Sequence, residues 1–275
     1  MIDLHLHTTA SDGSSTPEEL VADAKAAGIR GLAVTDHDSV AAIPAARAAA
    51  ARAGLAFVAG VEVTAVHAGR DVHVLGYFVD ERAREFATFL LAQRRDRGRR
   101  ATEMAVVLAD LGAKIDDTEI LAAVETGRAI GRPHVAAALV AAGHARDLAD
   151  AFNRYLAEGR PGYVARRGAG PAEVIARIRE AGGVASIAHP AKLADDSFIA
   201  PLARSGLAAI EVFHPDHDAR AVEKYKALAR ELGLAVTGGS DYHGPRTSRA
   251  SAFGRVGLSN DQYLVLANLA AGRDA

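Results

Sequence analysis

The sequence IDLHLHTTASDG, residues 2–13, contains the first expected strand and the first candidate metal ligands. Apolar and polar residues alternate from Ile2 to Leu6, which is the period-two pattern of a β-strand. His5 and His7 are two positions apart, so their side chains leave the same side of an extended chain and can bind one metal ion. Asp12 follows on the next loop. We therefore expect a strand over residues 2–6 whose end carries metal-binding groups.

Beyond this stretch, short apolar runs alternate with longer amphipathic ones. Thr16 and Pro17 have the N-cap and first-turn pattern of a helix that Gly28 closes. Strands that alternate with helices form βαβ units, so the sequence predicts an α/β fold with a mostly parallel sheet. The further predicted strands are 31–35, 56–63, 72–78, 184–188, 208–213 and 235–238, and the further predicted helices are 40–53, 171–181, 198–205, 219–232 and one from residue 260.

The strand pattern disappears between about residues 81 and 156. Helical periodicity dominates there, first in a long segment up to Leu111 and then in shorter segments at 117–125, 133–142 and 147–156. We expect residues 1–80 and 161–275 to form one α/β domain. Residues 81–160 are expected to be an all-helical insertion domain that forms part of the substrate pocket.

The composition excludes several classes of protein. The chain of 275 residues has 32 basic and 34 acidic side chains, and its net charge of −2 gives no general attraction to long duplex nucleic acid or to an anionic membrane. It has no cysteine, which excludes disulfides, thiolate zinc sites and cysteine nucleophiles. Neither a signal peptide nor a membrane-spanning apolar run is recognisable. We expect a cytoplasmic protein, and the sequence leaves the oligomeric state open.

Six of the eleven histidines lie on or just after predicted strands. A single such histidine is more often structural than a ligand, but carboxylates lie at similar positions, and burying so many polar groups without a metal or paired charges would be costly. In an α/β barrel the strand ends converge on one face. Imidazoles and carboxylates without thiolates suit Mn²⁺, Zn²⁺ or Fe²⁺. The candidate metal ligands are His5, His7, Asp12, His37, Glu62, His73, His189, Asp241 and His243.

Six short motifs occur in a fixed order along the chain: DLHLHTTASDG, AVTDHD, GVEV, HVLGY, IAHP and GSDYHG. Together they resemble the PHP family, the polymerase and histidinol phosphatase domains within the amidohydrolase superfamily. The similarity covers nearly the whole chain. It implies a distorted, TIM-like (β/α)₇ barrel with a binuclear or trinuclear metal site that hydrolyses phosphate esters.

Carried over to the matching positions, the resemblance implies three metal positions. The first would take His5, His7, Glu62 and Asp241; the second would share Glu62 and add His73 and His189; the third would use Asp12, His37 and His243. We expect two or three divalent ions per chain, with Mn²⁺ as the first choice and Zn²⁺ or Fe²⁺ as alternatives.

The expected reaction is attack of a metal-bridging hydroxide on phosphorus, because two cations lower the pKa of bound water and neutralise the phosphate oxygens. The expected catalytic residues are His189, His217 and Asp241. Either histidine could protonate the leaving oxygen, and His217 is favoured because a metal-bound imidazole cannot donate that proton.

The helical segment resembles the insertion of PHP phosphoesterases that act on nucleotides. Its basic residues also support a nucleotide substrate. Residues 94–100 carry five arginines, and Gly131-Arg132-Pro133-His134 places a cation at a helix start, where anions are favoured. Solvated helix faces would produce similar runs. His214 reads either as a ligand or as the start of a helix. The candidate substrate-binding residues are Arg97, Arg100, Arg132, His134 and His217.

We expect the enzyme to release the 3′-phosphate of nucleoside 3′,5′-bisphosphates, for example converting adenosine 3′,5′-bisphosphate (pAp) to AMP and phosphate. One alternative is a 5′-to-3′ exonuclease acting on short oligoribonucleotides with a 5′-phosphate, and another is a histidinol-phosphate-type phosphatase. A non-enzymatic alternative is a metal-binding module that docks a polymerase. The expected binding partner is therefore a small phosphorylated nucleotide or a short oligonucleotide.

Overall fold

The computed structural model describes residues 1–126, 128–193 and 195–272. A single sheet of seven strands runs in the order β1 to β7. Most predicted strands are confirmed with small shifts at their ends, although β1 is shorter and β3 longer than expected. The strands are β1 (Ile2–Asp3), β2 (Gly31–Val34), β3 (Ala56–His67), β4 (Arg70–Tyr77), β5 (Val184–Ile187), β6 (Ala209–Phe213) and β7 (Ala235–Gly238).

Four of the six strand pairs are parallel, and β4 is antiparallel to both of its neighbours. The prediction of a mostly parallel sheet is therefore confirmed, with one reversed strand. The reversal follows from the connection between β3 and β4, where only Ala68 and Gly69 lie between the strands. Both have positive φ, 49° and 79°. Antiparallel neighbours can be joined by such a tight turn, whereas parallel neighbours need a crossover.

The chain that follows β1 forms hydrogen bonds with the end of β7 and the chain that follows it, and these contacts nearly close the barrel. The Leu4 amide donates to the Gly238 carbonyl at 3.2 Å, and the His7 amide donates to the Tyr242 carbonyl at 2.9 Å. The expected distorted (β/α)₇ barrel is therefore confirmed. The outer helices, also close to their predicted positions, are α1 (Pro17–Ala26), α2 (Ile43–Ala53), α7 (Pro171–Glu180), α8 (Ile199–Arg204), α9 (Ala219–Leu232) and α10 (Asn260–Ala271).

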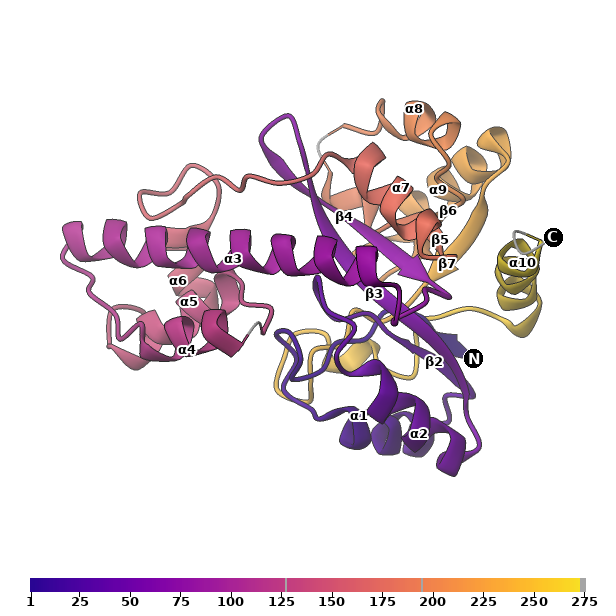
Figure 1. The fold of residues 1–275 in the computed structure, drawn as a ribbon, viewed down its shortest axis with the longest axis horizontal. Helices are drawn as coiled ribbons and strands as arrows, with labels where there is room; N and C mark the ends of the chain where they lie inside the picture. Colours follow the sequence, from indigo (N-terminus) through magenta and orange to yellow (C-terminus); the bar gives the residue numbers. More distant parts are fainter. Residues whose placement is uncertain (127, 194, 273–275) are drawn as a thin grey trace.

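The segment between β4 and α7 is helical and extends to one side of the sheet (Figure 1). It comprises α3 (Arg84–Asp110), α4 (Thr118–Thr126), α5 (Arg132–Ala141), α6 (Leu148–Ala151) and a π-helical turn (Phe152–Leu156), so the single helix predicted at 147–156 is two short pieces. Its own buried apolar cluster includes Leu108, Ile130 and Leu139. Near the other end of α3, Gln93 donates to the Thr64 carbonyl at 3.0 Å and ties the helix to β3. In the described chain, no helix is both long enough and apolar enough to cross a membrane.

Candidate metal centre and substrate pocket

Hydrogen bonds to the barrel fix the chain after β1 in an extended course. The Leu6 amide donates to the Thr35 hydroxyl at 3.1 Å, and the Thr35 amide donates to the Leu6 carbonyl at 2.8 Å. As a result His5 and His7 lie on the same side, with ring centroids 5.2 Å apart, and both are fully buried. The alternation read from the sequence therefore places these two imidazoles as predicted, even though β1 itself ends at Asp3.

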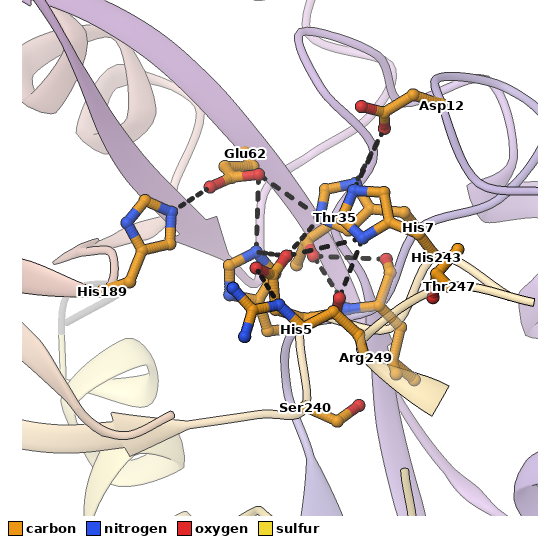
Figure 2. Close-up of polar contacts among 12 residues, drawn as sticks. His5, His7, Asp12, Thr35, Glu62, His189, Ser240, His243, Thr247 and Arg249 are labelled. Atoms are coloured by element: carbon orange, nitrogen blue, oxygen red, sulfur yellow. Dashed lines mark hydrogen bonds and ion pairs between the residues drawn. The ribbon is translucent and has the colours of Figure 1, made fainter. Parts of the chain in front are cut away.

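The carboxylate of Glu62 lies at the centre of the histidine cluster (Figure 2). Its Oε2 is 3.0 Å from His37 Nδ1, 3.3 Å from His7 Nε2 and 3.4 Å from His5 Nε2. Its Oε1 is 2.8 Å from His73 Nδ1 and 3.2 Å from His189 Nε2. Five imidazoles contributed by the chain after β1 and β2, by β4 and by the end of β5 therefore surround a single carboxylate from β3.

Two further carboxylates complete this arrangement. Asp241 Oδ1 is 3.5 Å from His5 Nε2 and 3.6 Å from both His7 Nε2 and His243 Nδ1. Asp12 lies at the other side of His7, with Oδ1 3.3 Å from His243 Nε2. The fold brings all nine predicted ligands together: His5, His7, Asp12, His37, Glu62, His73, His189, Asp241 and His243.

Several buried atoms of this cluster fit a metal centre because the described chain offers them no hydrogen-bond partner. These atoms are His5 Nε2, His7 Nδ1 and Nε2, His37 Nδ1, Glu62 Oε2 and His189 Nδ1. Leaving polar atoms buried and unpaired is costly, whereas metal coordination would satisfy them. The nitrogen and oxygen donors match Mn²⁺, Zn²⁺ or Fe²⁺.

The protonation states of the cluster also suit a cation. Burial acts to raise the pKa of Glu62, but the imidazoles of His37 and His73 outweigh it and hold the pKa well below its usual value. Burial lowers the pKa of His189 to about 3, so this imidazole is neutral. The pKa of His7 rises to about 10 despite its burial, because Asp241 and Glu62 favour positive charge at this position. The negative potential of these carboxylates, which raises the pKa of His7, would also attract a divalent ion.

Two members of the site were missed or left open by the sequence reasoning. Glu211, in β6, is fully buried and lies beside His5, with Oε1 2.8 Å from Nδ1. His214 Nε2 is 3.2 Å from Asp241 Oδ2. Glu211, His214 and His5 are close enough to share one ion. Glu211 could have been recognised from its position, because it lies in a predicted strand and is followed closely by a histidine, as in the other candidate ligand pairs.

Asp36 supports the loop that carries Asp12. Its Oδ1 accepts from the Thr8 amide and the Ser11 hydroxyl, and its Oδ2 accepts from the Thr8 hydroxyl, each at 2.7 Å. All three residues are buried. The TDHD motif therefore contributes a histidine to the cluster and a carboxylate that fixes the first loop.

Two cations lie beside Asp241 on the outer side of the cluster. Lys192 Nζ is 3.3 Å and Arg249 Nε is 3.5 Å from Asp241 Oδ2. Asp216 contacts both, with Lys192 Nζ at 3.4 Å and a two-point pairing to Arg249. This network was not predicted, because its members come from three separate loops.

A cavity of about 160 Å³ connects the cluster with the helical segment. Asp12, His37 and His73 line it on the barrel side. The cations lining it are Arg97, Arg100, Arg132 and Arg166. The first three were predicted as substrate-binding residues, whereas Arg166 lies in an irregular segment that gave no signal.

Buried carboxylates hold these arginines in place. Arg97 pairs with Asp38 through Nε, and Arg166 Nη2 donates to the same Oδ2 at 3.0 Å. Asp71 Oδ2 accepts from Arg100 Nη1 at 3.1 Å and from Arg132 Nη2 at 3.3 Å. Asp38 and Asp71 thus fix four guanidinium groups around one cavity.

Two predicted substrate-binding histidines are not among the described residues that line this cavity. His134 lines a neighbouring cavity with Asp116 and Glu119, and its Nδ1 accepts from the Gly131 amide at 3.2 Å. His217 Nδ1 is 2.8 Å from the Val212 carbonyl, so it carries the proton, and its Nε2 accepts from the Ala191 amide at 3.4 Å. In this arrangement His217 has no free proton for a leaving group.

The chain is similar to several known proteins over most of its length. The PHP domain family matches residues 3–158. The 3′,5′-nucleoside bisphosphate phosphatase of Chromobacterium violaceum is 34% identical over 249 residues, which cover 89% of this chain and 87% of the relative. The 5′-3′ exoribonuclease Rnm of Escherichia coli is 36% identical over 252 residues, covering 88% and 85%. A solved structure from Bifidobacterium adolescentis, described as a metal-dependent phosphoesterase, superimposes with a TM-score of 0.88 at 33% identity and covers 96% of this chain and 94% of its own.

Proposed function

The chain belongs to the PHP domain family and is a metal-dependent phosphoesterase, and on that premise we propose that it removes the 3′-phosphate from nucleoside 3′,5′-bisphosphates. With pAp the products would be AMP and inorganic phosphate. One observation carries the proposal: the cavity that opens on the imidazole and carboxylate cluster also holds four arginines. A substrate with two phosphates could place one at the cluster and the other at the arginines.

The residues proposed to hold the ions are those the sequence predicted. One ion would bind His5, His7, Glu62 and Asp241, a second Glu62, His73 and His189, and a third Asp12, His37 and His243. We take Mn²⁺ as the first candidate. When bound, such ions supply Lewis acidity that activates water and neutralises charge on phosphate oxygens.

The arginines would bind the phosphate that is not cleaved. Among the described residues that line the cavity, four are arginines and two, Asp12 and Asp71, are carboxylates. The positive side chains therefore outnumber the negative ones, which favours binding of an anion. A phosphate monoester carries about −1.5 to −2 charges near neutral pH, and guanidinium groups bind it through paired hydrogen bonds. Because Asp38 and Asp71 already fix the guanidiniums, little side-chain ordering is needed on binding. Binding energy from the remote phosphate can then orient the reacting one.

Two parts of the chain contribute different groups to the proposed active site. We propose that residues 1–80 and 161–275 form the metal-bearing barrel, and that residues 81–160 form an inserted helical domain. The insertion provides Arg97, Arg100 and Arg132 to the pocket. The barrel provides Asp71 and the cluster. For the leaving oxygen, the hydrogen bonds of His217 disfavour its predicted role as proton donor.

A substrate comparison tests this function. Purified protein stripped of metal and reloaded with Mn²⁺ should release phosphate from pAp with a kcat/KM at least about 100-fold above that for AMP or an aryl phosphate, as expected if the second phosphate adds about 3 kcal/mol of binding in the transition state. Chromatography should show AMP as the nucleoside product. Equal kcat/KM for all three substrates, or 3′-AMP as the product, would remove the assignment.

A further inference from the structure

A separate cavity lies along the first half of α3, the helix that runs from the barrel into the helical segment (Figure 1). It has a volume of about 450 Å³, and we call it the α3 cavity. Its other walls come from the loop between β2 and α2 and from the chain around the end of α4. None of the residues described in its lining also lines the substrate cavity. The two cavities are therefore separate.

The spacing of residues along α3 explains why the two cavities receive different arginines. Arg97 and Arg100 line the substrate cavity. Arg94 and Arg95 follow Leu91 by three and four positions, so the three side chains share one face of the helix, and this face lines the α3 cavity. The proposed function uses the first pair of arginines and leaves the second pair without a role.

The cations of the α3 cavity lack the carboxylate partners that hold the arginines of the substrate cavity. Three arginines line it, Arg94, Arg95 and Arg128, and none of them forms an ion pair with a carboxylate of the described residues. By contrast, Arg99 on the same helix pairs with Asp96 at 2.7 Å. The described lining of the α3 cavity also contains no carboxylate. The positive charge there is unbalanced, which favours an anion.

One edge of the Arg94 guanidinium is free to bind such an anion. Its Nη1 donates to the Asp38 carbonyl at 2.8 Å, whereas its Nε is buried and has no hydrogen-bond partner among the described residues. Burial also lowers the pKa of Arg94, because the charge has lost part of its solvation. Nε and Nη2 form the edge of a guanidinium that binds two oxygens of a phosphate group. A phosphate would therefore satisfy Nε and offset the lost solvation.

The rest of the wall is mainly aliphatic. Leu90 is buried there, and Val40 and Leu91 are half-buried beside the arginines. No aromatic ring occurs in the lining that the structure describes. Nucleic-acid bases bind by stacking on aromatic rings, so this cavity does not suit a nucleotide strand. Its surface is complementary to a phosphate that carries a short aliphatic group.

We propose that the α3 cavity is a second anion site, which binds a small organic phosphate with an aliphatic body and lies apart from the reacting centre. Arg94, Arg95 and Arg128 would bind the phosphate group, and the leucines beside them would contact the aliphatic part. The inference goes beyond the proposed function and does not depend on it, because it uses no residue of the metal cluster or of the substrate cavity.

Calorimetry on metal-free protein tests the site with alkylphosphonates, in which a carbon–phosphorus bond replaces the ester. Butylphosphonate should bind about tenfold more tightly than methylphosphonate, since each additional buried methylene group adds affinity. Arg95→Ala combined with Arg128→Ala should raise the Kd for butylphosphonate at least about tenfold. Both side chains are exposed, so their removal should leave thermal unfolding unchanged. Arg84→Ala, at an exposed arginine of α3, is the matched control and should leave this Kd unchanged.

The arginines of the substrate cavity can also bind a phosphonate, so wild-type protein should show two sites per chain. Arg132→Ala should weaken one of them and leave the other within about twofold of its wild-type Kd. A single site that weakens in Arg132→Ala but not in the double variant would assign all the binding to the substrate cavity and overturn the proposal. Equal affinities for butylphosphonate and methylphosphonate would overturn the assignment of an aliphatic ligand. Since the test uses no turnover, it stands even if pAp is not a substrate.

Discussion

The carboxylate of Glu211 joins the ring of His5 to the backbone of His189. Its Oε1 is 2.8 Å from His5 Nδ1, and its Oε2 accepts from the His189 amide at 2.7 Å. The first contact leaves His5 Nε2 directed at Glu62 and Asp241. The second holds His189 at φ 27°, a left-handed conformation that non-glycine residues seldom adopt. One buried carboxylate thus orients two candidate metal ligands.

Glu211→Gln should weaken metal binding. The amide group cannot accept at both positions, so either His5 or the His189 amide loses its partner. Loss of a carboxylate that orients a metal-binding histidine costs about 10–100-fold in affinity. Titration of metal-free protein with Mn²⁺ measures this, with Glu173→Gln, at an exposed site on α7, as the control. Unchanged affinity would show that the carboxylate does not position the ligands.

Removal of metal should abolish phosphatase turnover and lower Tm. A ligand that binds only the folded protein adds about 2.7 kcal/mol of stability at a concentration 100 times its Kd. Thermal unfolding at rising Mn²⁺ after chelation should therefore show Tm increasing with the logarithm of metal concentration. A Tm independent of Mn²⁺ would contradict the metal centre.

Asp241→Ala and His37→Ala should each abolish turnover with Mn²⁺ while unfolding stays cooperative. Both residues contact the cluster directly, and Asp241 lies within 3.6 Å of four imidazoles. Phosphate release and thermal unfolding, measured on the same preparations, separate lost chemistry from lost fold. Turnover retained at the wild-type level in either variant would contradict the assigned role.

Arg132→Ala should raise KM for pAp about 10–100-fold, the loss expected for a charge-assisted contact, and should change KM for an aryl phosphate far less. Arg132 is half-buried and paired only with Asp71 among the described carboxylates, so its removal leaves Asp71 bonded to Arg100. Steady-state kinetics with both substrates provides the comparison. Equal effects would assign Arg132 to folding instead.

Asp38→Ala should destabilise the protein by about 3–5 kcal/mol, the usual cost of removing one partner of a buried ion pair. Asp38 is fully buried between Arg97 and Arg166 and also accepts from the Thr64 amide at 3.0 Å. Urea denaturation measures the change. Asp150→Ala, whose partners Arg146 and Arg154 are exposed, should destabilise the protein far less.

Much of the fold was predictable because its signals are local. The predicted ranges of α9 (Ala219–Leu232) and β7 (Ala235–Gly238) match the structure residue for residue. The reversed direction of β4 was not predicted, because the alternation of apolar and polar residues is the same in a strand that runs either way.

The sequence by itself determined the α/β alternation and the nine candidate ligands, since strand ends and residue types are read within a few neighbouring positions. Only the tertiary structure decided which groups support them. Glu211 meets His5 across 206 positions of the chain, and Arg166 meets Asp38 across 128. Hydrogen bonds and ion pairs act over a few ångströms in space, so partners this far apart in sequence are defined only once the barrel has closed.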